Sequence, residues 1–205
     1  GKTLAFLVPA VNRLLTSRPL TKADPRAIIL APTRELAKQV FMQAKKLTAT
    51  QSSISVVLIV GGENYNDQVK MLRKKPDIIV GTAGRIADHI DGKSFFLNGI
   101  ELLILDEADR MFDLGFIKDI RYLFNRMPKP TERLSMLFSA TLSYRVQELA
   151  YDHMDNPTHV QIEPERKTAE RVKEELFYPS DEDKPYLLLS LMEEEWPDKA
   201  IVFAN

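Results

Sequence analysis

Two adjacent acids follow a short apolar run near the middle of the sequence, and their types and spacing suit phosphate chemistry. The run is Leu102-Leu103-Ile104-Leu105; Asp106 and Glu107 come directly after it, and Asp109 stands two residues further on. Four consecutive apolar residues are typical of a strand buried on both faces of a sheet, so we expect both acids at its carboxyl end. In a site that hydrolyses a nucleotide, the first acid holds Mg²⁺ and the second orients and deprotonates the attacking water. A solvated acidic turn after a strand is the alternative interpretation.

A second chemical signal stands at the start of the sequence, where Gly1-Lys2-Thr3 precedes the apolar, helix-like Leu4-Ala5-Phe6-Leu7-Val8. A phosphate-binding loop ends in Gly-Lys-Ser/Thr, in which the lysine neutralises the β- and γ-phosphates and the hydroxyl ligates Mg²⁺. The amino end of the helix that follows adds backbone N–H donors. The tripeptide alone is weak evidence for a phosphate-binding loop, because it occurs by chance in many proteins. The acids on the same predicted sheet favour a nucleotide site over an ordinary surface tripeptide.

Two hydroxyls stand at the end of the next predicted strand. Ser139-Ala140-Thr141 follows the apolar Met136-Leu137-Phe138. Hydroxyls that flank a small residue can hydrogen-bond the Asp109 carboxylate from the adjacent strand end. Capping of a helix by Ser139, Thr141 or Ser143 is the local alternative, and the two roles are compatible.

Three further strand ends carry small or turn-forming residues beside a hydroxyl or an arginine. Exposed backbone N–H groups, hydroxyls and guanidinium groups would make a row of contacts to the phosphates of one nucleic-acid strand, and glycines permit close approach of the ligand. For each segment the alternative is a helix cap or a turn with an incidental arginine. The candidate nucleic-acid contacts are Pro32, Thr33, Arg34, Gly61, Gly62, Thr82, Gly84 and Arg85.

Short apolar runs alternate with longer segments that have helical spacing. This alternation predicts right-handed crossovers and an open parallel α/β sheet with helices on both faces. Ligands bind such sheets at the carboxyl ends of the strands, which is where the polar motifs stand. The predicted strands are residues 27–30, 56–60, 78–80, 102–105 and 136–138.

The character of the sequence changes after residue 163. We predict a first domain over residues 1–163, a charge-rich linker over 164–175, and the start of a second α/β domain over 176–205. The second domain is expected to contain a helix near residues 186–195 and a strand at 200–203. Because the sequence begins in the tail of a phosphate loop and stops in an apolar run, we expect a fragment of a longer protein.

Composition narrows the class of protein. An apolar content of 44% with 28% charged residues is typical of a soluble globular chain, and no apolar run is long enough to span a bilayer. The absence of cysteine excludes disulfides, thiolate zinc sites and thiol nucleophiles, and fits an intracellular protein. The net charge of -1 means that any phosphate-binding surface is a local patch. His89, His153 and His159 lack metal-ligand spacing and are interpreted as surface or helix residues.

Taken in order, these motifs resemble those of the DEAD-box RNA helicases, and Asp106-Glu107-Ala108-Asp109 spells the name of that family. The resemblance implies two RecA-like domains that close on ATP, Mg²⁺ and single-stranded RNA and bend the strand so that a short duplex separates. It identifies the open sheet as RecA-like and residues 176–205 as the start of a second RecA-like domain. The other matching segments are Gly1-Lys2-Thr3, Pro32-Thr33-Arg34-Glu35-Leu36-Ala37, Gly61-Gly62, Thr82-Ala83-Gly84-Arg85, Ser139-Ala140-Thr141 and Ile201-Val202-Phe203-Ala204-Asn205.

The resemblance assigns roles to the nucleotide-site candidates. Gly1, Lys2 and Thr3 would bind the phosphates, Thr3 and Asp106 would hold Mg²⁺, and Glu107 would activate the water. Lys2, Asp106 and Glu107 thus form the expected catalytic set, with ATP and Mg²⁺ as cofactors.

The resemblance also assigns the remaining candidates. Asp109, Ser139 and Thr141 would couple hydrolysis to strand separation, and the eight strand-end residues would line the RNA track. The family usually has proline where Ala83 stands. Loss of the fixed φ of proline predicts slightly looser positioning of Arg85.

A narrower resemblance, to one bacterial branch of the family, rests on residues 110–121, 137–146 and 173–180. It implies RNA turnover in the cytoplasm together with the endoribonuclease RNase E, and RNA rather than DNA as the ligand. An arginine finger in phosphoryl transfer contributes about 10³–10⁵ in rate, and in this family it belongs to the second domain. We therefore expect little or no ATPase or unwinding activity from the 205 residues alone. A DNA-directed ATPase of the same fold and a non-catalytic RNA-clamping module are the alternatives.

Overall fold

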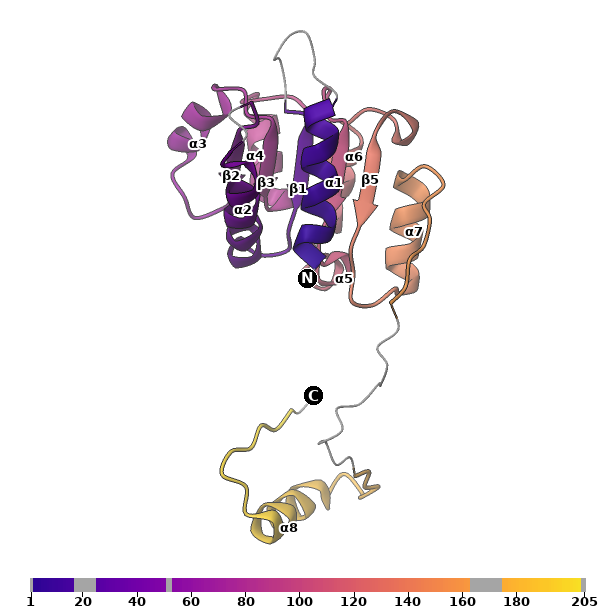
Figure 1. The fold of residues 1–205 in the computed structure, drawn as a ribbon. Helices are drawn as coiled ribbons and strands as arrows, with labels where there is room; N and C mark the ends of the chain where they lie inside the picture. Colours follow the sequence, from indigo (N-terminus) through magenta and orange to yellow (C-terminus); the bar gives the residue numbers. More distant parts are fainter. Residues whose placement is uncertain (1, 17–24, 51–52, 163–174, 204–205) are drawn as a thin grey trace. The chain divides into compact units, whose positions relative to one another are not determined.

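Five short strands lie side by side, all parallel, in the order β2-β3-β1-β4-β5 (Figure 1). In β1, Ile29 lies opposite Val80 of β3 on one side and Ile104 of β4 on the other. The computed structural model describes residues 2–16, 25–50, 53–162 and 175–203. The strands are β1 (Ala27–Leu30), β2 (Val56–Ile59), β3 (Ile78–Gly81), β4 (Leu102–Leu105) and β5 (Leu134–Leu137).

Helices cover both faces of this sheet, because successive side chains of a strand point to opposite faces. Ala27 and Ile29 of β1 enter the core beneath α1 and α2, whereas Ile28 and Leu30 enter the core on the other face, with side chains of α3 to α7. Among the described residues, no helix has the length and apolarity that crossing a membrane requires. The helices are α1 (Lys2–Thr16), α2 (Arg34–Thr48), α3 (Tyr65–Leu72), α4 (Ala83–Asp91), α5 (Ala108–Asp113), α6 (Ile117–Phe124), the 3₁₀ turn η1 (Pro130–Glu132) and α7 (Tyr144–His153).

Side-chain caps mark where two of the helices begin. The Thr33 hydroxyl accepts a hydrogen bond from the backbone N–H of Leu36 at the start of α2. At the start of α3, the Asn64 side chain accepts from the backbone N–H groups of Asn66 and Asp67. Such caps satisfy N–H groups that have no partner inside the helix. Each cap stands directly after a strand or its turn, and so returns the chain over the sheet.

The predicted fold class is confirmed, as an open parallel sheet with helices on both faces. β2 and β3 end within one residue of their predictions, whereas β5 is displaced and covers residues 134–137 rather than 136–138. It is an edge strand of the described sheet, and Leu134 is 38% exposed. A continuous apolar run marks strands that are buried on both faces, so it misplaces a half-exposed edge strand.

Residues 160–205 form a separate compact unit. Its helix α8 (Lys184–Glu195) confirms the helix predicted near residues 186–195. The strand predicted at 200–203 is wrong, because the structure assigns no strand within residues 175–203. A strand requires a neighbour for its backbone hydrogen bonds, which the described part of this unit does not supply. The predicted domain boundaries stay a prediction, and residues 164–174 of the predicted linker lie outside the described residues.

Candidate functional site

The polar segments predicted at strand ends lie along one edge of the sheet, because parallel strands share a carboxyl edge. The sheet order divides this edge into two halves. One half follows β4 and β5, and we call it the acidic half. The other follows β1, β2 and β3, and we call it the arginine half. The acidic half consists of Asp106, Glu107, Asp109, Ser139 and Thr141, and the arginine half of Thr33, Arg34, Gly61, Gly62, Thr82, Gly84 and Arg85.

Asp106 is the buried member of the acidic half, with 4% of its surface exposed directly after β4. Burial raises the pKa of its carboxyl, and the adjacent Glu107 charge raises it further. A backbone N–H from Glu107 and the charge of Lys2 oppose the rise without cancelling it. An anion that is poorly solvated and next to a like charge gains most from a bound cation.

The amino end of α1 supplies the opposing charge. Lys2 is exposed and Thr3 half-buried, and the ring of Phe6 packs against Phe138 after β5, with centroids 5.1 Å apart. Gly1 lies outside the described residues. The Thr3 hydroxyl and the Asp106 carboxylate are hard oxygen donors, which fit Mg²⁺ held mainly by phosphates and water. Within the described ranges, no group of three His, Cys, Asp or Glu side chains could hold a metal ion without such help.

Glu107 differs from Asp106 in both backbone and exposure. Its φ of 52° and ψ of 55° are left-handed, a conformation that costs a non-glycine residue about 1–2 kcal/mol. Its side chain is 38% exposed and its Oε2 lies 3.4 Å from Nη1 of Arg110. The left-handed turn separates the two neighbouring acids, so one is buried beside Lys2 while the other faces solvent, where water is available.

Asp109 is joined to the end of β5 by Thr141. The backbone N–H and the hydroxyl of Thr141 donate to Oδ2 of Asp109, at 3.0 and 2.9 Å. Ser139 takes a different place: its oxygen accepts from the backbone N–H of Asp109, and its proton goes to the Thr141 carbonyl oxygen at 2.7 Å. Burial raises the pKa of the Asp109 carboxyl, but the neighbouring Ser139 hydroxyl, the hydrogen bonds from the hydroxyl and backbone N–H of Thr141, and the backbone N–H of Arg110 lower it by more.

In the arginine half, Arg34 packs over the turn that follows β2. Its Nη1 donates to the Gly61 carbonyl oxygen at 3.4 Å. Gly62 has a φ of 79°, and a Cβ there would lie 2.2 Å from Nη1 of Arg34. The φ of Gly62 favours glycine, and any larger residue there would also displace the Arg34 guanidinium group. Thr33 serves as the cap of α2, as the alternative interpretation expected, and Pro32 beside it is buried.

The segment after β3 places two candidates at the start of α4. Thr82 is the N-cap residue, yet its side chain makes no capping hydrogen bond. A Cβ on Gly84 would meet only Oδ2 of Asp119, at 3.5 Å, so packing within the chain does not require glycine there. Arg85 is 17% exposed at its side chain, and its Nη2 donates to the Glu63 carbonyl oxygen beyond the Gly61-Gly62 turn.

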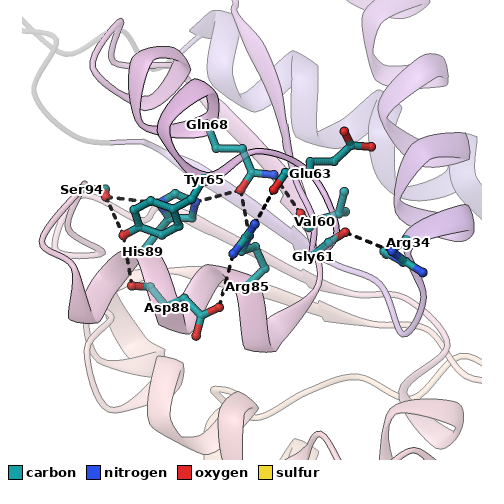
Figure 2. A network of polar contacts seen from close by, with 10 residues as sticks. All are labelled: Arg34, Val60, Gly61, Glu63, Tyr65, Gln68, Arg85, Asp88, His89 and Ser94. Atoms are coloured by element: carbon teal, nitrogen blue, oxygen red, sulfur yellow. Dashed lines mark hydrogen bonds and ion pairs between the residues drawn. The ribbon is translucent and has the colours of Figure 1, made fainter.

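Three residues that the sequence analysis did not assign to the site connect these segments: Tyr65, Gln68 and His89 (Figure 2). His89 is helical as expected, but it is fully buried rather than at the surface. Gln68 is 2% exposed and bonds both His89 and Arg85. The available signal was a polar residue on a core-facing side of a helix, since Gln68 stands four residues before the buried Leu72.

A comparison with models of known protein families matches residues 1–149 to "DEAD/DEAH box helicase". The match takes in both halves of the carboxyl edge and well over half of the chain. The chain belongs to the DEAD/DEAH box helicase family. The predicted membership is thereby confirmed.

Curated relatives agree with this placement in the helicase family. The chain is 70% identical over 205 residues to "ATP-dependent RNA helicase RhlB" of Pseudoalteromonas atlantica, covering all of this chain and 48% of that protein. It is 63% identical over 209 residues to the protein of the same name from Aeromonas hydrophila, again with 48% of that protein covered. This DEAD-box chain thus spans about half the length of the curated relatives it matches.

Solved structures of the family share the fold. The yeast DEAD-box splicing factor Prp28 is 32% identical with a TM-score of 0.71, over 76% of this chain and 37% of that one. A DEAD box protein from the hyperthermophile Methanococcus jannaschii is 36% identical with a TM-score of 0.66, over 76% and 40%. The sheet is therefore RecA-like, as predicted. The roles assigned to individual site residues stay predictions.

Proposed function

We propose that the full-length protein, meaning a chain extended to the length of these relatives, is an ATP-dependent RNA helicase of the RhlB type. The observation that carries the proposal is the divided carboxyl edge. Its acidic half suits a nucleotide with Mg²⁺, and its arginine half suits a phosphate backbone. Both stand on one sheet, so a single domain movement can act on both ligands.

The acidic half divides the work of hydrolysis between its two acids. Lys2 neutralises phosphate charge, and Thr3 and Asp106 hold Mg²⁺, whose charge stabilises the phosphate oxygens when it is bound. Glu107, aimed away from Asp106 by its left-handed backbone, orients the attacking water and accepts its proton. Burial of Asp106 strengthens its attraction for a cation, because the carboxylate is poorly stabilised without the ion.

Coupling runs through the bonds that join the ends of β4 and β5. Asp109 lies in the first turn of α5, which begins directly after Glu107, and Thr141 donates two hydrogen bonds to its carboxylate. A shift of Glu107 on hydrolysis therefore moves the loop after β5. We assign Asp109, Ser139 and Thr141 to this link between hydrolysis and strand separation.

The arginine half binds one strand of RNA through its phosphates. Arg34 and Arg85 supply charge, the open Thr82 hydroxyl supplies a hydrogen bond, and Gly61 and Gly62 allow close approach. Contacts to phosphate do not identify the sugar, so the preference for RNA over DNA requires contacts to the 2′-hydroxyl.

The test measures ATP turnover of the full-length protein with matched single-stranded RNA and DNA of one length and sequence. We expect stimulation by RNA and little by DNA. Equal stimulation by both supports the DNA-directed ATPase instead. Binding of RNA without any ATP turnover supports the RNA-clamping module.

The 205 residues alone are proposed to turn over little or no ATP, because the family's arginine finger belongs to the second domain. RNA-stimulated turnover by this chain near the rate of the full-length protein contradicts that.

The similarity to RhlB further supports a role in messenger RNA degradation in the cytoplasm, in company with RNase E. Affinity purification of the tagged full-length protein from its own cells, with and without ribonuclease treatment, tests this association. Absence of the endoribonuclease from both preparations argues against it.

A further inference from the structure

On its buried side, Arg85 contacts a chain of hydrogen-bonded polar side chains that runs from α3 to α4 (Figure 2). Gln68 on α3 and His89 on α4 are 2% and 0% exposed. Oε1 of Gln68 lies 3.1 Å from Nε of Arg85 and 2.8 Å from Nε2 of His89. Buried polar groups are expensive unless they are paired, so the burial of two side chains under one arginine calls for a function.

The partners of Gln68 leave its amide only one orientation. Arginine has donors and no acceptor, so the amide oxygen must face Arg85. The amide nitrogen then donates to the Val60 carbonyl oxygen at 2.8 Å, directly before the Gly61-Gly62 turn. Gln68 therefore ties three things together: the end of β2, the guanidinium group of Arg85, and the ring of His89.

The same logic fixes the state of His89. Because the Gln68 oxygen can only accept, Nε2 of His89 carries the proton, and Nδ1, 3.2 Å from the Ser94 hydroxyl, is left to accept. Burial lowers the pKa of His89 to about 4, and the Arg85 charge contributes. The ring is neutral near pH 7, so it donates to Gln68 without adding positive charge beneath Arg85.

Tyr65 closes the arrangement from the side. Its ring stacks on His89, with centroids 4.1 Å apart and an angle of 6° between the planes, and Cζ of Arg85 lies 5.4 Å from its centroid. A Cβ on Gly92 would lie 2.2 Å from the Tyr65 hydroxyl, so the stack depends on glycine there. Aromatic face, amide oxygen and the Glu63 carbonyl oxygen restrain three sides of one guanidinium group.

Arg85 keeps donors to spare. Five N–H groups are available on a guanidinium, and Nε and one N–H of Nη2 are used by Gln68 and Glu63. Nη1 is only 3.8 Å from the exposed carboxylate of Asp88, a loose contact. The second N–H of Nη2 and the N–H groups of Nη1 are left for the phosphates of the proposed strand.

We propose that Gln68, backed by His89, is a positioning residue that presents Arg85 to the nucleic-acid backbone and locks it to the Gly61-Gly62 turn. The inference rests on the proposed function, in which Arg85 contacts phosphate. A fixed guanidinium loses less conformational freedom on binding than a free one. Gln68 thus contributes to RNA affinity without touching RNA.

The test is a double-mutant cycle in the full-length protein, with single-stranded RNA and a non-hydrolysable ATP analogue. Arg85→Ala and Gln68→Leu are each expected to weaken RNA binding about tenfold, the size of one charged hydrogen bond. Each should also reduce the magnitude of the negative slope of log affinity against log salt by about 0.7, the share of one single-strand phosphate contact. In the Arg85→Ala background, Gln68→Leu should add nothing, because it acts only through that arginine.

Leu72→Ala is the matched control. Leu72 stands one turn after Gln68 on α3 and is equally buried, but has no bond to Arg85. It should lower the melting temperature and leave the salt slope unchanged. His89→Phe, which keeps the ring stack on Tyr65 and removes the N–H donor, serves if Gln68→Leu does not fold. It should weaken RNA binding several-fold, again only when Arg85 is present.

The two proposals fail in different ways. If Arg85→Ala leaves RNA affinity unchanged, both the contact of Arg85 with RNA and its positioning are rejected. If Arg85→Ala weakens binding while Gln68→Leu is without effect, or is additive with it, RNA contact stands and the positioning role is overturned.

Discussion

The two halves of the carboxyl edge are built on opposite principles. In the arginine half, Arg85 is bonded to Gln68 and Glu63, and Arg34 reaches over Gly62 to the Gly61 carbonyl oxygen. In the acidic half, burial and a neighbouring carboxylate disfavour the charge on Asp106, and Glu107 has a left-handed backbone. Beside Asp109 and Thr141 the acidic half opens into a cleft of about 430 Å³.

This difference bears on how far each half is preformed for its proposed ligand. The arginine half bonds its charged groups to the rest of the chain and still leaves donors of Arg85 to spare, so it holds the geometry for a phosphate backbone before any ligand binds. The acidic half carries a disfavoured charge on Asp106, which a bound cation can offset. We infer that RNA meets a largely preformed surface, whereas the nucleotide completes an unfinished one.

The largest expected effect separates chemistry from binding. Glu107→Gln keeps the size of the side chain and removes the base, so ATP turnover of the full-length protein should fall by about 10²–10⁴. RNA affinity should stay within twofold of wild type, because the arginine half is intact. Steady-state turnover and fluorescence anisotropy measure the two quantities.

Glu148→Gln, a change at an exposed carboxyl on α7, is the control for Glu107→Gln and should alter neither quantity. Unchanged turnover in Glu107→Gln would remove Glu107 as the base. A parallel loss of RNA affinity would show that the two halves are not separable.

Two adjacent glycines provide a matched pair in the arginine half. Gly62→Ala places a Cβ at a φ of 79° and against Arg34, whereas a Cβ on Gly61 has nothing within 4 Å. We expect Gly62→Ala to cost about 1–2 kcal/mol of stability and to weaken RNA binding, since Arg34 must move. Gly61→Ala should be close to neutral for stability. Urea unfolding and RNA binding of both variants compare them, and equal effects would contradict the assigned packing of Arg34.

Substitution of Asp106 is expected to raise the stability of the protein while its activity is lost. The pKa of Asp106 is raised in the folded protein, so the folded state binds the proton more readily than the unfolded one, and stability falls as the pH rises through that pKa. Asp106→Asn should therefore stabilise the nucleotide-free protein at pH 7, by on the order of 1 kcal/mol, and abolish ATP turnover. The gain should vanish at acidic pH, where the aspartate is itself protonated. Thermal melting at the two pH values checks it, and a destabilised variant at pH 7 would reverse the sign of the argument.

The sequence predicted the parts of the fold that repeat a simple physical pattern. The runs at residues 27–30 and 102–105 are buried on both faces and were located to the residue. Edge strand β5 was misplaced because Leu134 is half exposed and Ser135 is polar. The strand expected at 200–203 failed because strands depend on partners that local sequence does not contain.

For the candidate site, the sequence identified residue types but not how they are supported. Acids after a strand and glycines in turns leave a local signature. Gln68 leaves only a polar residue on the core-facing side of a helix, and its partners are not visible in the sequence, since its bonds join residues far apart along the chain, as in the 2.8 Å contact with His89. The left-handed backbone of Glu107 could not be predicted either, because a glycine or asparagine is the residue type that indicates such a conformation.

The smallest expected effect concerns Ala83, where the family usually has proline. Ala83 is the first residue of α4, a position at which the missing N–H of proline is tolerated and its fixed φ is favourable. Thr82 before it is extended, at φ -100° and ψ 141°, as a residue preceding proline prefers. Ala83→Pro should therefore raise stability by about 0.4–1 kcal/mol through the unfolded state. Because Gln68 already holds Arg85, Ala83→Pro alone should barely change RNA affinity. Added to Gln68→Leu, it should restore part of the RNA affinity that Gln68→Leu removes. No recovery there would mean that helix geometry and the buried chain act on Arg85 independently.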